Sequence, residues 1–305
     1  MLTITKCFLG TIMSIIMTCS LEAQTPFQVP TSVDSRLLMD AAGPEQRSFL
    51  DAVYLIVCPN EGAGTGFLLD DRVVVTNSHV VGSCGESALF AISSKNDHVR
   101  FTKIINDKQR DLALLIPDGH LSHGLALASA KPPAPGTTVS TWGFPLLYNG
   151  TTPLLSVGYV SGFRTDESNG KPVKHIIVNG AFNHGNSGGP LFIAGSKEVI
   201  GVVVLTFHFY PPQVKQIIDG LAKTGSGLQL ATHKRPDGQT ESLSEAQITA
   251  MVLDEFYQKT QVMIGEAIAA SEVASLMTER AAELPSKLSH AASPNGAGIH
   301  LNSSQ

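Results

Sequence analysis

The chain has 305 residues, of which 43% are hydrophobic and 15% charged, so it is long enough to bury one large core or two smaller ones. Its formal net charge is −5 and it contains no basic run, so it lacks the electrostatic footprint of a protein that binds nucleic acid or an anionic membrane. We therefore expect neither of these partners.

Residues 1–23 have the pattern of an export signal. Lys6 supplies a positive charge, residues 7–18 are apolar, and Leu21-Glu22-Ala23 offers a cleavage site. The apolar stretch is short for a membrane-spanning helix. Besides cleavage after Ala23, two alternatives stay open: the chain is lipidated at Cys19, or the segment is an uncleaved membrane anchor. We predict that the chain is exported, and is either periplasmic or secreted.

Residues 24–47 are polar and are expected to lie over the body of the protein as a leader. Beyond them, β-branched or apolar runs alternate with turn residues, at 52–58, 65–69, 72–76, 87–92, 98–105, 111–117 and 125–129. A second set follows the Pro/Gly-rich stretch 131–136, at 137–144, 153–163, 173–179, 190–193, 199–207 and 227–232. Roughly six strands on each side of a linker predict a mainly β fold, with two packed six-stranded antiparallel β-barrels at about 48–130 and 137–235.

Helical spacing of apolar residues appears in two other places. Within 211–225, a short helix is predicted by Val214, Ile217, Ile218 and Leu221. Within 240–284, Ser242 and Glu245 suggest a capping box at the start of a C-terminal α-helical extension. One apolar stripe, broken near Lys259 and by Gly265, is predicted along that extension by Ile248, Val252, Phe256, Met263, Ala267, Ala270, Ala274 and Met277.

The apolar stripe of the extension must be covered. It is expected to dock on the barrels or on another subunit, so self-association through the C-terminal helix is one interpretation. Residues 285–305 are rich in Ser, Gly and Asn and are predicted to be a disordered tail.

A serine stands in the Gly-rich stretch 185–190 (Gly-Asn-Ser-Gly-Gly-Pro), just before an apolar run. Glycines around Ser187 suit a tight turn that exposes one side chain and aims backbone N–H groups at one point. Upstream, His79 lies near the end of a β-branched run and Asp111 heads another apolar run. A serine nucleophile needs a base to take its proton, and the base needs a carboxylate to orient it. His79, Asp111 and Ser187 are therefore predicted to form a catalytic triad.

The order His, Asp, Ser and the sequences around these residues resemble the trypsin-like (chymotrypsin-fold) serine peptidases, most closely the HtrA/Deg-like and glutamyl-endopeptidase-like bacterial branches. The matching motifs are Gly64-Thr65-Gly66-Phe67, Thr76-Asn77-Ser78-His79-Val80, Asp111-Leu112-Ala113-Leu114-Leu115 and Gly185-Asn186-Ser187-Gly188-Gly189-Pro190-Leu191. The resemblance covers about residues 50–206. It implies a peptidase domain at 48–235 with the site between the barrels, a protein or peptide substrate, and no cofactor. The PDZ domain that is frequent in HtrA-like proteins would need several strands in 240–284, where none is predicted.

The proposed roles follow from this resemblance and from the chemistry. His79 acts as general base and then general acid, Asp111 orients it, and Ser187 is the nucleophile. The backbone N–H groups of Gly185 and Ser187 form the oxyanion hole. Asn186 replaces the aspartate that pairs with a newly cut N-terminus in zymogen-activated relatives, so activation by that route is not expected.

An alternative role for Asp111 is that of a strand-end aspartate paired with Arg110. Adjacent residues on a strand point to opposite faces, so this pairing is disfavoured. Asp107 is the nearest competing carboxylate, and it is better explained as a turn residue.

Substrate preference is predicted less specifically. Trypsin carries a carboxylate where this chain has Ala181, so a preference for Arg or Lys is disfavoured. A small or medium apolar residue before the scissile bond is favoured, and an acidic residue read by His184 or His208 stays open. The predicted substrate-binding residues are Ala181, Val204, Leu205, Thr206 and His208.

Removal of the signal would leave Cys58 and Cys84, which flank His79. Many trypsin-like enzymes carry a disulfide in this position, so the resemblance implies that the two cysteines pair in an oxidising compartment. The alternative is two buried free thiols. His120 and His123 have no third ligand near them in the sequence, so no metal site is predicted.

These observations favour an exported serine endopeptidase. Two alternatives remain, a protease-fold scaffolding protein that acts through its C-terminal helices and an esterase that uses the same triad.

Overall fold

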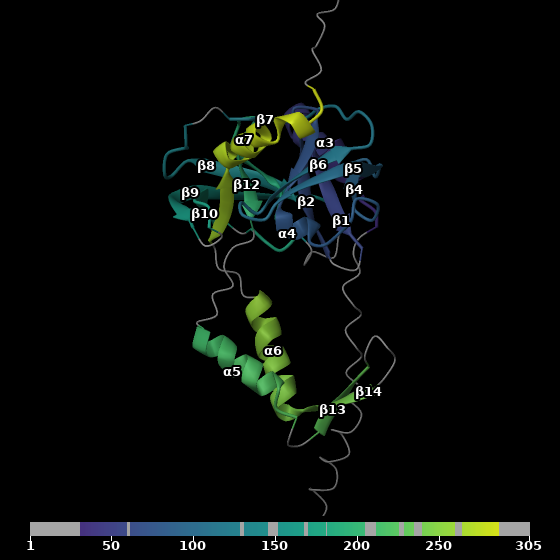
Figure 1. The fold of residues 1–305 in the computed structure, drawn as a ribbon, viewed down its shortest axis with the longest axis vertical. Helices are drawn as coiled ribbons and strands as arrows, with labels where there is room; N and C mark the ends of the chain where they lie inside the picture. Colours follow the sequence, from purple (N-terminus) through teal and green to yellow (C-terminus); the bar gives the residue numbers. More distant parts are fainter. Residues whose placement is uncertain are drawn as a thin grey trace, which may run out of the picture.

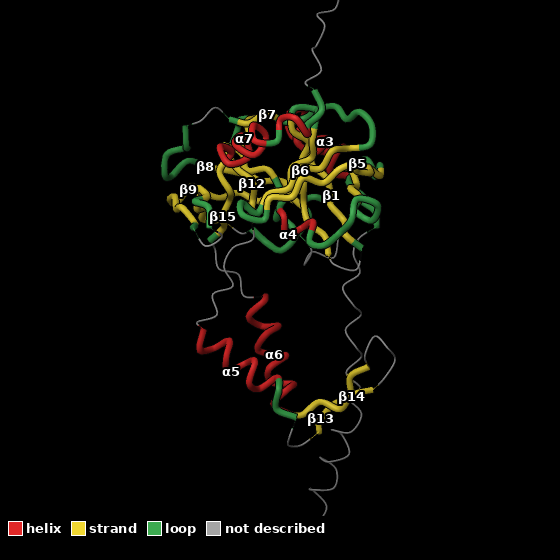
Figure 2. The backbone as a smooth tube through the Cα atoms, viewed as in Figure 1, coloured by secondary structure: helices red, strands yellow, loops and turns green. Residues whose placement is uncertain are grey.

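The computed structural model describes residues 31–59, 62–128, 131–145, 152–167, 170–180, 182–204, 212–225, 229–234, 240–259 and 264–286. Two β-barrels form the body, and strands dominate it in both views (Figures 1 and 2). The predicted signal at residues 1–23 and residues 287–305 of the predicted tail lie outside the described residues. Among the described helices, none combines the length and the apolar character needed to cross a bilayer.

The first barrel consists of six antiparallel strands in the closed order β1-β2-β3-β6-β5-β4. Their bounds are β1 Val53–Cys58, β2 Gly62–Leu69, β3 Val73–Thr76, β4 Phe90–Ser93, β5 His98–Asp107 and β6 Leu112–Pro117. Every side chain of β1 is buried, because its two faces meet different cores. Leu55 joins the core that the two barrels share, whereas Ile56 joins the core of the first barrel alone.

The second barrel closes in the order β11-β8-β9-β10-β15-β12, through the pairing of β11 with β12. Its strands are β8 Thr138–Gly143, β9 Leu154–Asp166, β10 Val173–Gly180, β11 Pro190–Ile193, β12 Glu198–Val204 and β15 Gly265–Ala269. The short β7 (Ala126–Leu127) pairs with β12 in parallel, so the run predicted at 125–129 belongs to the second sheet. The prediction of two six-stranded antiparallel barrels is confirmed.

The last strand of the second barrel is not where the sequence analysis placed it. The segment near 227–232 forms β13 (Gln229–Lys234), which pairs with β14 (Thr240–Ser244) in a separate hairpin. The barrel is instead completed by β15, which pairs with β10 and β12. This segment was predicted as part of the helical extension, and it begins at Gly265, where a break in the apolar stripe was expected. The hydrogen bonds to β10 and β12 therefore decide the structure of this segment, although the spacing of its apolar residues suggests a helix.

The strand β15 is fixed in place by a buried carboxylate. Glu266 has 3% of its side chain exposed and pairs with Arg164 of β9 at 2.5 Å and with His175 of β10 at 2.9 Å. Burial raises the pKa of Glu266, but the hydrogen bonds from His175 and Arg164 outweigh burial and hold the pKa below its ordinary value. The charge is thus satisfied inside the sheet.

The segment between β12 and β15 is an insertion that contains α5 (Pro212–Ala222), the hairpin β13-β14 and α6 (Glu245–Lys259). The helix predicted within 211–225 is therefore present. The capping box of α6 lies two residues later than predicted, because Ser244 N–H donates to Gln247 Oε1 at 2.9 Å and Gln247 N–H donates to Ser244 Oγ at 3.3 Å. The α5 and α6 helices contact each other (Figure 1).

Two short helices precede the first barrel, α2 (Arg36–Ala41) and α3 (Pro44–Ala52). Part of the predicted leader is thus helical. Phe49 of α3 is 7% exposed and its ring lies 4.5 Å from the ring of Phe192 on β11, so α3 packs into the core that both barrels share.

Helix α7 (Ala270–Glu279) follows β15 directly and ends in a short 3₁₀ turn, η2 (Ala281–Glu283). Val273 and Leu276 are fully buried and belong to the shared core. The C-terminal helix therefore docks on the barrels of its own chain.

We expect Phe49→Ala to lower the free energy of unfolding by about 3–5 kcal/mol, because truncation of a buried ring leaves a cavity in the shared core. Denaturant-induced unfolding measures this change. Leu37→Ala is the control, since Leu37 on α2 is 86% exposed and its truncation should leave the unfolding free energy nearly unchanged. Equal effects of the two substitutions would contradict the packing of α3.

Candidate active site

His79 and Asp111 are in direct contact on the first barrel. His79 lies in α4 (Ser78–Val81), a one-turn helix after β3, and Asp111 lies in the turn before β6. His79 Nδ1 is 2.8 Å from Asp111 Oδ2, and the backbone N–H of His79 donates to Asp111 Oδ1 at 2.9 Å. Both carboxylate oxygens thus contact the histidine, which leaves Nε2 as the ring nitrogen that can serve as a base.

The backbone of Asp111 is held in an uncommon conformation. Its φ of 55° lies in the left-handed region, which costs an L-residue about 1–2 kcal/mol, with Asp among the most tolerant residues. Asn77 Nδ2 donates to the carbonyl of Asp111 at 3.0 Å. The carboxylate therefore reaches the histidine from a turn that its surroundings must maintain.

Ser187 lies on the second barrel, in the loop between β10 and β11, and is 4% exposed. Its carbonyl accepts a hydrogen bond from Thr65 N–H of β2 at 2.8 Å. Thr65 Oγ1 donates to the carbonyl of Gly185 at 2.6 Å. On its other side, the loop pairs with β12, since Gly188 N–H donates to the carbonyl of Val203 at 2.8 Å. The serine loop is thus anchored to both barrels.

Contacts at Gly64 bring the histidine and serine segments together. A Cβ placed on Gly64 would lie 2.7 Å from Cγ2 of Val80, the neighbour of His79, and 3.2 Å from the carbonyl oxygen of Ser187. The two segments therefore meet at β2, which lacks a side chain at that position. His79 and Asp111 are thus in direct contact, and the segment that carries Ser187 meets the segment that carries His79 at Gly64.

Gly185 and Gly188 both have positive φ, 97° and 86°. A Cβ on Gly188 would lie 2.0 Å from the carbonyl oxygen of Thr65 and 2.3 Å from Thr76 Oγ1. Glycine is required here both by the conformation and by the close approach of β2.

The sequence analysis assigned no role to three polar residues that support the site. Thr65 binds Gly185 and also accepts from Phe144 N–H at 3.0 Å, and Thr76 Oγ1 donates to the carbonyl of Thr65 at 2.7 Å. Asn77 binds the carbonyl of Asp111. One signal in the sequence could have indicated these roles. Thr65, Thr76 and Asn77 all stand in the motifs that carry the family resemblance.

The predicted substrate-binding residues are only partly described. Val204 ends β12, opposite Glu266 and next to the residue that pairs with the serine loop. His184 lies in the serine loop three residues before Ser187. Ala181, Leu205, Thr206 and His208 lie outside the described residues, so their roles stay predictions.

Cys58 at the end of β1 and Cys84 after α4 are bonded in the structure, with their Cα atoms 5.8 Å apart. The bond brackets the helix that carries His79. It joins segments that are 26 residues apart in the chain.

Arg110, the residue before Asp111, does not pair with it in any contact of the described structure. Instead its guanidinium binds three carboxylates: Asp107 at 2.5 Å, Glu272 at 3.5 Å, and Glu279 through two hydrogen bonds. Asp107 also accepts from the backbone N–H of Arg110 at 3.1 Å, which agrees with its predicted place in the turn. The carboxylates hold the pKa of Arg110 above its ordinary value.

Comparison with known protein families agrees with this geometry. Residues 64–202, which include His79, Asp111 and Ser187, match the family described as the trypsin-like peptidase domain. This part of the chain is similar to that family. The resemblance inferred from the motifs is confirmed for this domain.

Curated relatives of the peptidase domain include bacterial proteases. A probable periplasmic serine endoprotease DegP-like protein from Rhizobium meliloti (strain 1021) is 28% identical over 202 residues, which are 60% of this chain and 39% of the relative. The putative serine protease HhoB from Synechocystis is 32% identical over 148 residues, 47% of this chain and 34% of the relative. The chain thus spans well under half the length of these relatives.

Solved structures share the fold of the peptidase domain and its surroundings. The inactive form of Rv3671c from M. tuberculosis H37Rv aligns with a TM-score of 0.53 and 18% identity, over 85% of this chain and 100% of that one. The active form of the same protease aligns with a TM-score of 0.52 over 82% of this chain.

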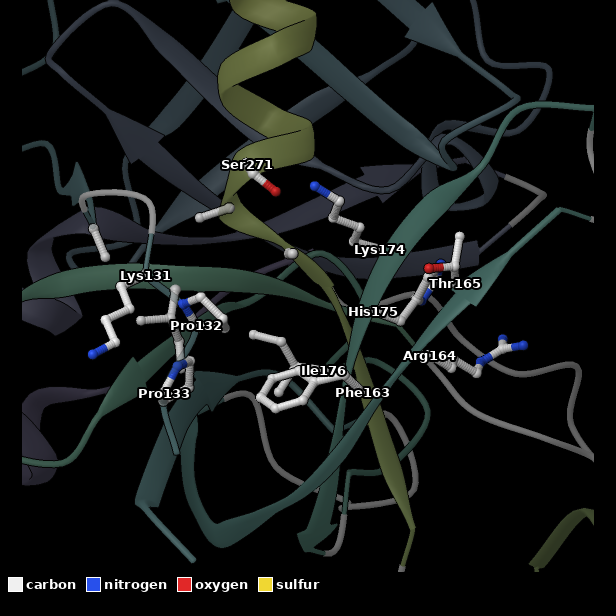
Figure 3. Close-up of a pocket in the computed structure, with 14 residues that line it drawn as sticks. Lys131, Pro132, Pro133, Phe163, Arg164, Thr165, Lys174, His175, Ile176 and Ser271 are labelled. Carbon is white, nitrogen blue, oxygen red and sulfur yellow. The ribbon is translucent and has the colours of Figure 1, made fainter. Parts of the chain in front are cut away.

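A pocket of about 610 Å³ lies on the second barrel of the peptidase fold, between the linker, β9, β10 and the start of α7. Figure 3 shows Pro132, Phe163 and Ile176 around it, with Lys174 and Ser271 reaching over it from β10 and α7. Its lining residues include neither His79 nor Ser187, so it is distinct from the candidate active site. Among the described residues, no three His, Cys, Asp or Glu side chains cluster as metal ligands would.

We expect Gly188→Ala to abolish both native stability and reaction with serine-directed probes, because its methyl group would overlap the carbonyl oxygen of Thr65. Gly195→Ala is the matched control. Gly195 has a similar φ of 79°, but a Cβ there would meet nothing within 4 Å. Urea unfolding should show a loss of about 1–2 kcal/mol for the control, from backbone strain alone. Equal losses in the two variants would argue against the close approach of β2.

A pH dependence is expected from Glu279. Hydrogen bonds from Arg110 and then Lys171 lower its pKa from the ordinary 4.5 to about 2. A carboxyl with a depressed pKa in the folded state stabilises the fold above its unfolded pKa, and this stability is lost as the pH falls through the folded pKa. Between pH 4.5 and 2, unfolding measurements should therefore show a steeper loss of stability for the wild type than for Glu279→Gln. Equal slopes would contradict the assignment.

Proposed function

We propose that this chain is an exported serine endopeptidase that hydrolyses peptide bonds through His79, Asp111 and Ser187. The observation that carries the proposal is the pair of hydrogen bonds by which His79 holds both oxygens of Asp111, within a trypsin-like peptidase domain whose Gly-rich loop presents Ser187. Both curated relatives described above bear the printed name of a serine protease, which agrees with this activity.

The reaction follows from the chemistry of these groups. His79 Nε2 takes the proton of Ser187 Oγ as the oxygen attacks the substrate carbonyl carbon, and Asp111 stabilises the imidazolium that forms. The backbone N–H groups of Gly185 and Ser187 bind the oxyanion. His79 then gives its proton to the leaving amine, and a water molecule, activated by His79, hydrolyses the acyl-enzyme and restores the serine.

The substrate preference is proposed from the residues around the serine loop. Ala181 gives no carboxylate to attract Arg or Lys, so a small or medium apolar residue is expected before the scissile bond. Val204, Leu205, Thr206 and His208 would contact that residue. An acidic residue bound by His184 or His208 is the competing preference, and mapped cut sites in a mixed peptide library distinguish the two.

Export is proposed from three observations that agree. Residues 1–23 have the pattern of a signal, the Rhizobium relative is named periplasmic, and Cys58 and Cys84 are bonded as expected in an oxidising compartment. A structural disulfide near the histidine would be at risk in a reducing cytosol.

The proposal predicts that a fluorophosphonate probe labels the wild-type chain and that Ser187→Ala abolishes labelling. Asp111→Asn should slow labelling by roughly 10⁴-fold, because the histidine loses the partner that sets its tautomer. Mass spectrometry of the labelled protein measures both effects. Ser196→Ala is the control, since Ser196 lies in the β11–β12 turn and its loss should leave labelling unchanged.

The same experiment tests the alternatives. A well-folded wild type that takes up no label and cuts no casein would overturn the peptidase and favour a scaffolding role for this fold. Labelling with ester hydrolysis but no cleavage of casein or of a mixed peptide library would indicate an esterase.

A further inference from the structure

The turn that carries Asp111 is bound to the C-terminal helix through Arg110. The side chain of Arg110 is only 2% exposed, so its charge is removed from water and depends on the carboxylates around it. Two of these, Glu272 and Glu279, belong to α7, which lies more than 160 residues further along the chain.

The spacing of the two glutamates suits this contact. They are seven residues apart, so nearly two full turns separate them and both lie on one face of α7. Glu279 binds two nitrogens of the guanidinium in the fork geometry that arginine favours with carboxylates. Glu272, which is 8% exposed, approaches Nε at 3.5 Å. The face of α7 thus matches the shape and the charge of one arginine.

The same glutamates also reach the second barrel. Glu279 accepts from Lys171 Nζ at 3.2 Å, and Glu272 accepts from the backbone N–H of Lys174 at 3.4 Å. Lys171 and Lys174 lie just before and within β10, which leads toward the serine loop. α7 therefore connects the turn of Asp111 on one barrel with the second barrel.

The contact acts on the backbone at Asp111. Asp107 accepts hydrogen bonds from the backbone of Gln109 and Arg110, so the guanidinium and the peptide groups of Arg110 are both tied to the same carboxylate. The next residue, Asp111, has the left-handed φ of 55° and directs both carboxylate oxygens to His79. The hydrogen bonds that hold Arg110 and those that hold the Asp111 carboxylate therefore belong to one turn.

We propose that Arg110, clamped by Glu279 and Glu272 of α7, is a positioning residue that orients Asp111 and through it His79. This role rests on the proposed function of the triad. The C-terminal helix is then part of the support of the active site, and it acts without touching substrate or the reacting atoms.

The decisive variant is Glu279→Gln, which weakens the clamp while Asp107 and Glu272 still neutralise the arginine. The matched control is Glu283→Gln. Glu283 lies in η2, directly after α7, and pairs with Lys103 of β5 at 2.8 Å, so it also joins the C-terminal segment to the first barrel. Its described contacts do not include Arg110. The Glu283 side chain is 33% exposed and that of Glu279 48% exposed, so the control removes a no less buried carboxylate.

In the full chain, Glu279→Gln should lower kcat and the rate of fluorophosphonate labelling at Ser187 by about tenfold or more, with KM changed less than twofold, and should shift the pH profile of labelling. Glu283→Gln should leave kcat and the profile within twofold of the wild type. A double variant, Arg110→Glu with Glu279→Arg, should recover part of the activity that Arg110→Glu alone loses. Equal kcat in Glu279→Gln and the wild type, or equal losses in the two glutamate variants, would overturn the positioning role.

A second measurement does not depend on turnover. The NMR resonance of the proton on His79 Nδ1 reports the hydrogen bond to Asp111 directly, and Ser187→Ala provides a background without catalysis. In that background, Glu279→Gln should shift or broaden the resonance and Glu283→Gln should not. An unchanged resonance would overturn the proposal. Failure of the wild type to label with the probe, with the resonance still responding to Glu279→Gln, would instead remove the peptidase assignment and keep the clamp.

Discussion

The contact between β2 and the serine loop is the constraint on which the rest of the structure depends. Thr65 gives two hydrogen bonds across it, one from its backbone to Ser187 and one from its hydroxyl to Gly185. The strand approaches so closely that residue 188 can carry no side chain. Since the histidine and the aspartate come from one barrel and the serine from the other, this contact determines where the three residues lie relative to one another.

The two barrels therefore have different tasks. The first holds His79 against both oxygens of Asp111 and closes the surrounding segment with the bond between Cys58 and Cys84. The second supplies the loop around Ser187, in which Gly185 and Gly188 adopt positive φ. Two helices, α3 before the first barrel and α7 after β15, pack into the core that the barrels share.

Much of this arrangement could be predicted from the sequence, because its signals are local. The strands rich in Val, Ile and Leu, the Pro/Gly-rich linker and the short motifs around the three residues can each be recognised within a few consecutive positions. β15 could not be recognised, because Gly265–Ala269 has few β-branched residues and joins a helical pattern on both sides. Its pairing partners β10 and β12, and the residues that neutralise Glu266, lie roughly 60 to 100 positions earlier in the chain.

The support of the site was missed for the same reason. Arg110 was considered as a partner of its neighbour and that pairing was disfavoured, but the reason given was wrong, because both residues lie in the turn before β6 and not on a strand. The actual partners lie in α7, and no local pattern links them to the arginine. Thr65 likewise acts on a residue 120 positions away. Such contacts follow from the closed barrels and become visible only when the fold is known.

The position of β15 also bears on how the protein matures. A chain that is synthesised or translocated from its N-terminus brings out all three proposed catalytic residues well before the strand that fits between β10 and β12. Until β15 arrives, β10 and β12 each have an unpaired edge. Helix α7, which follows β15, cannot yet reach Arg110. We expect hydrolysis to begin only after β15 and α7 have emerged, which would protect the machinery that synthesises the chain.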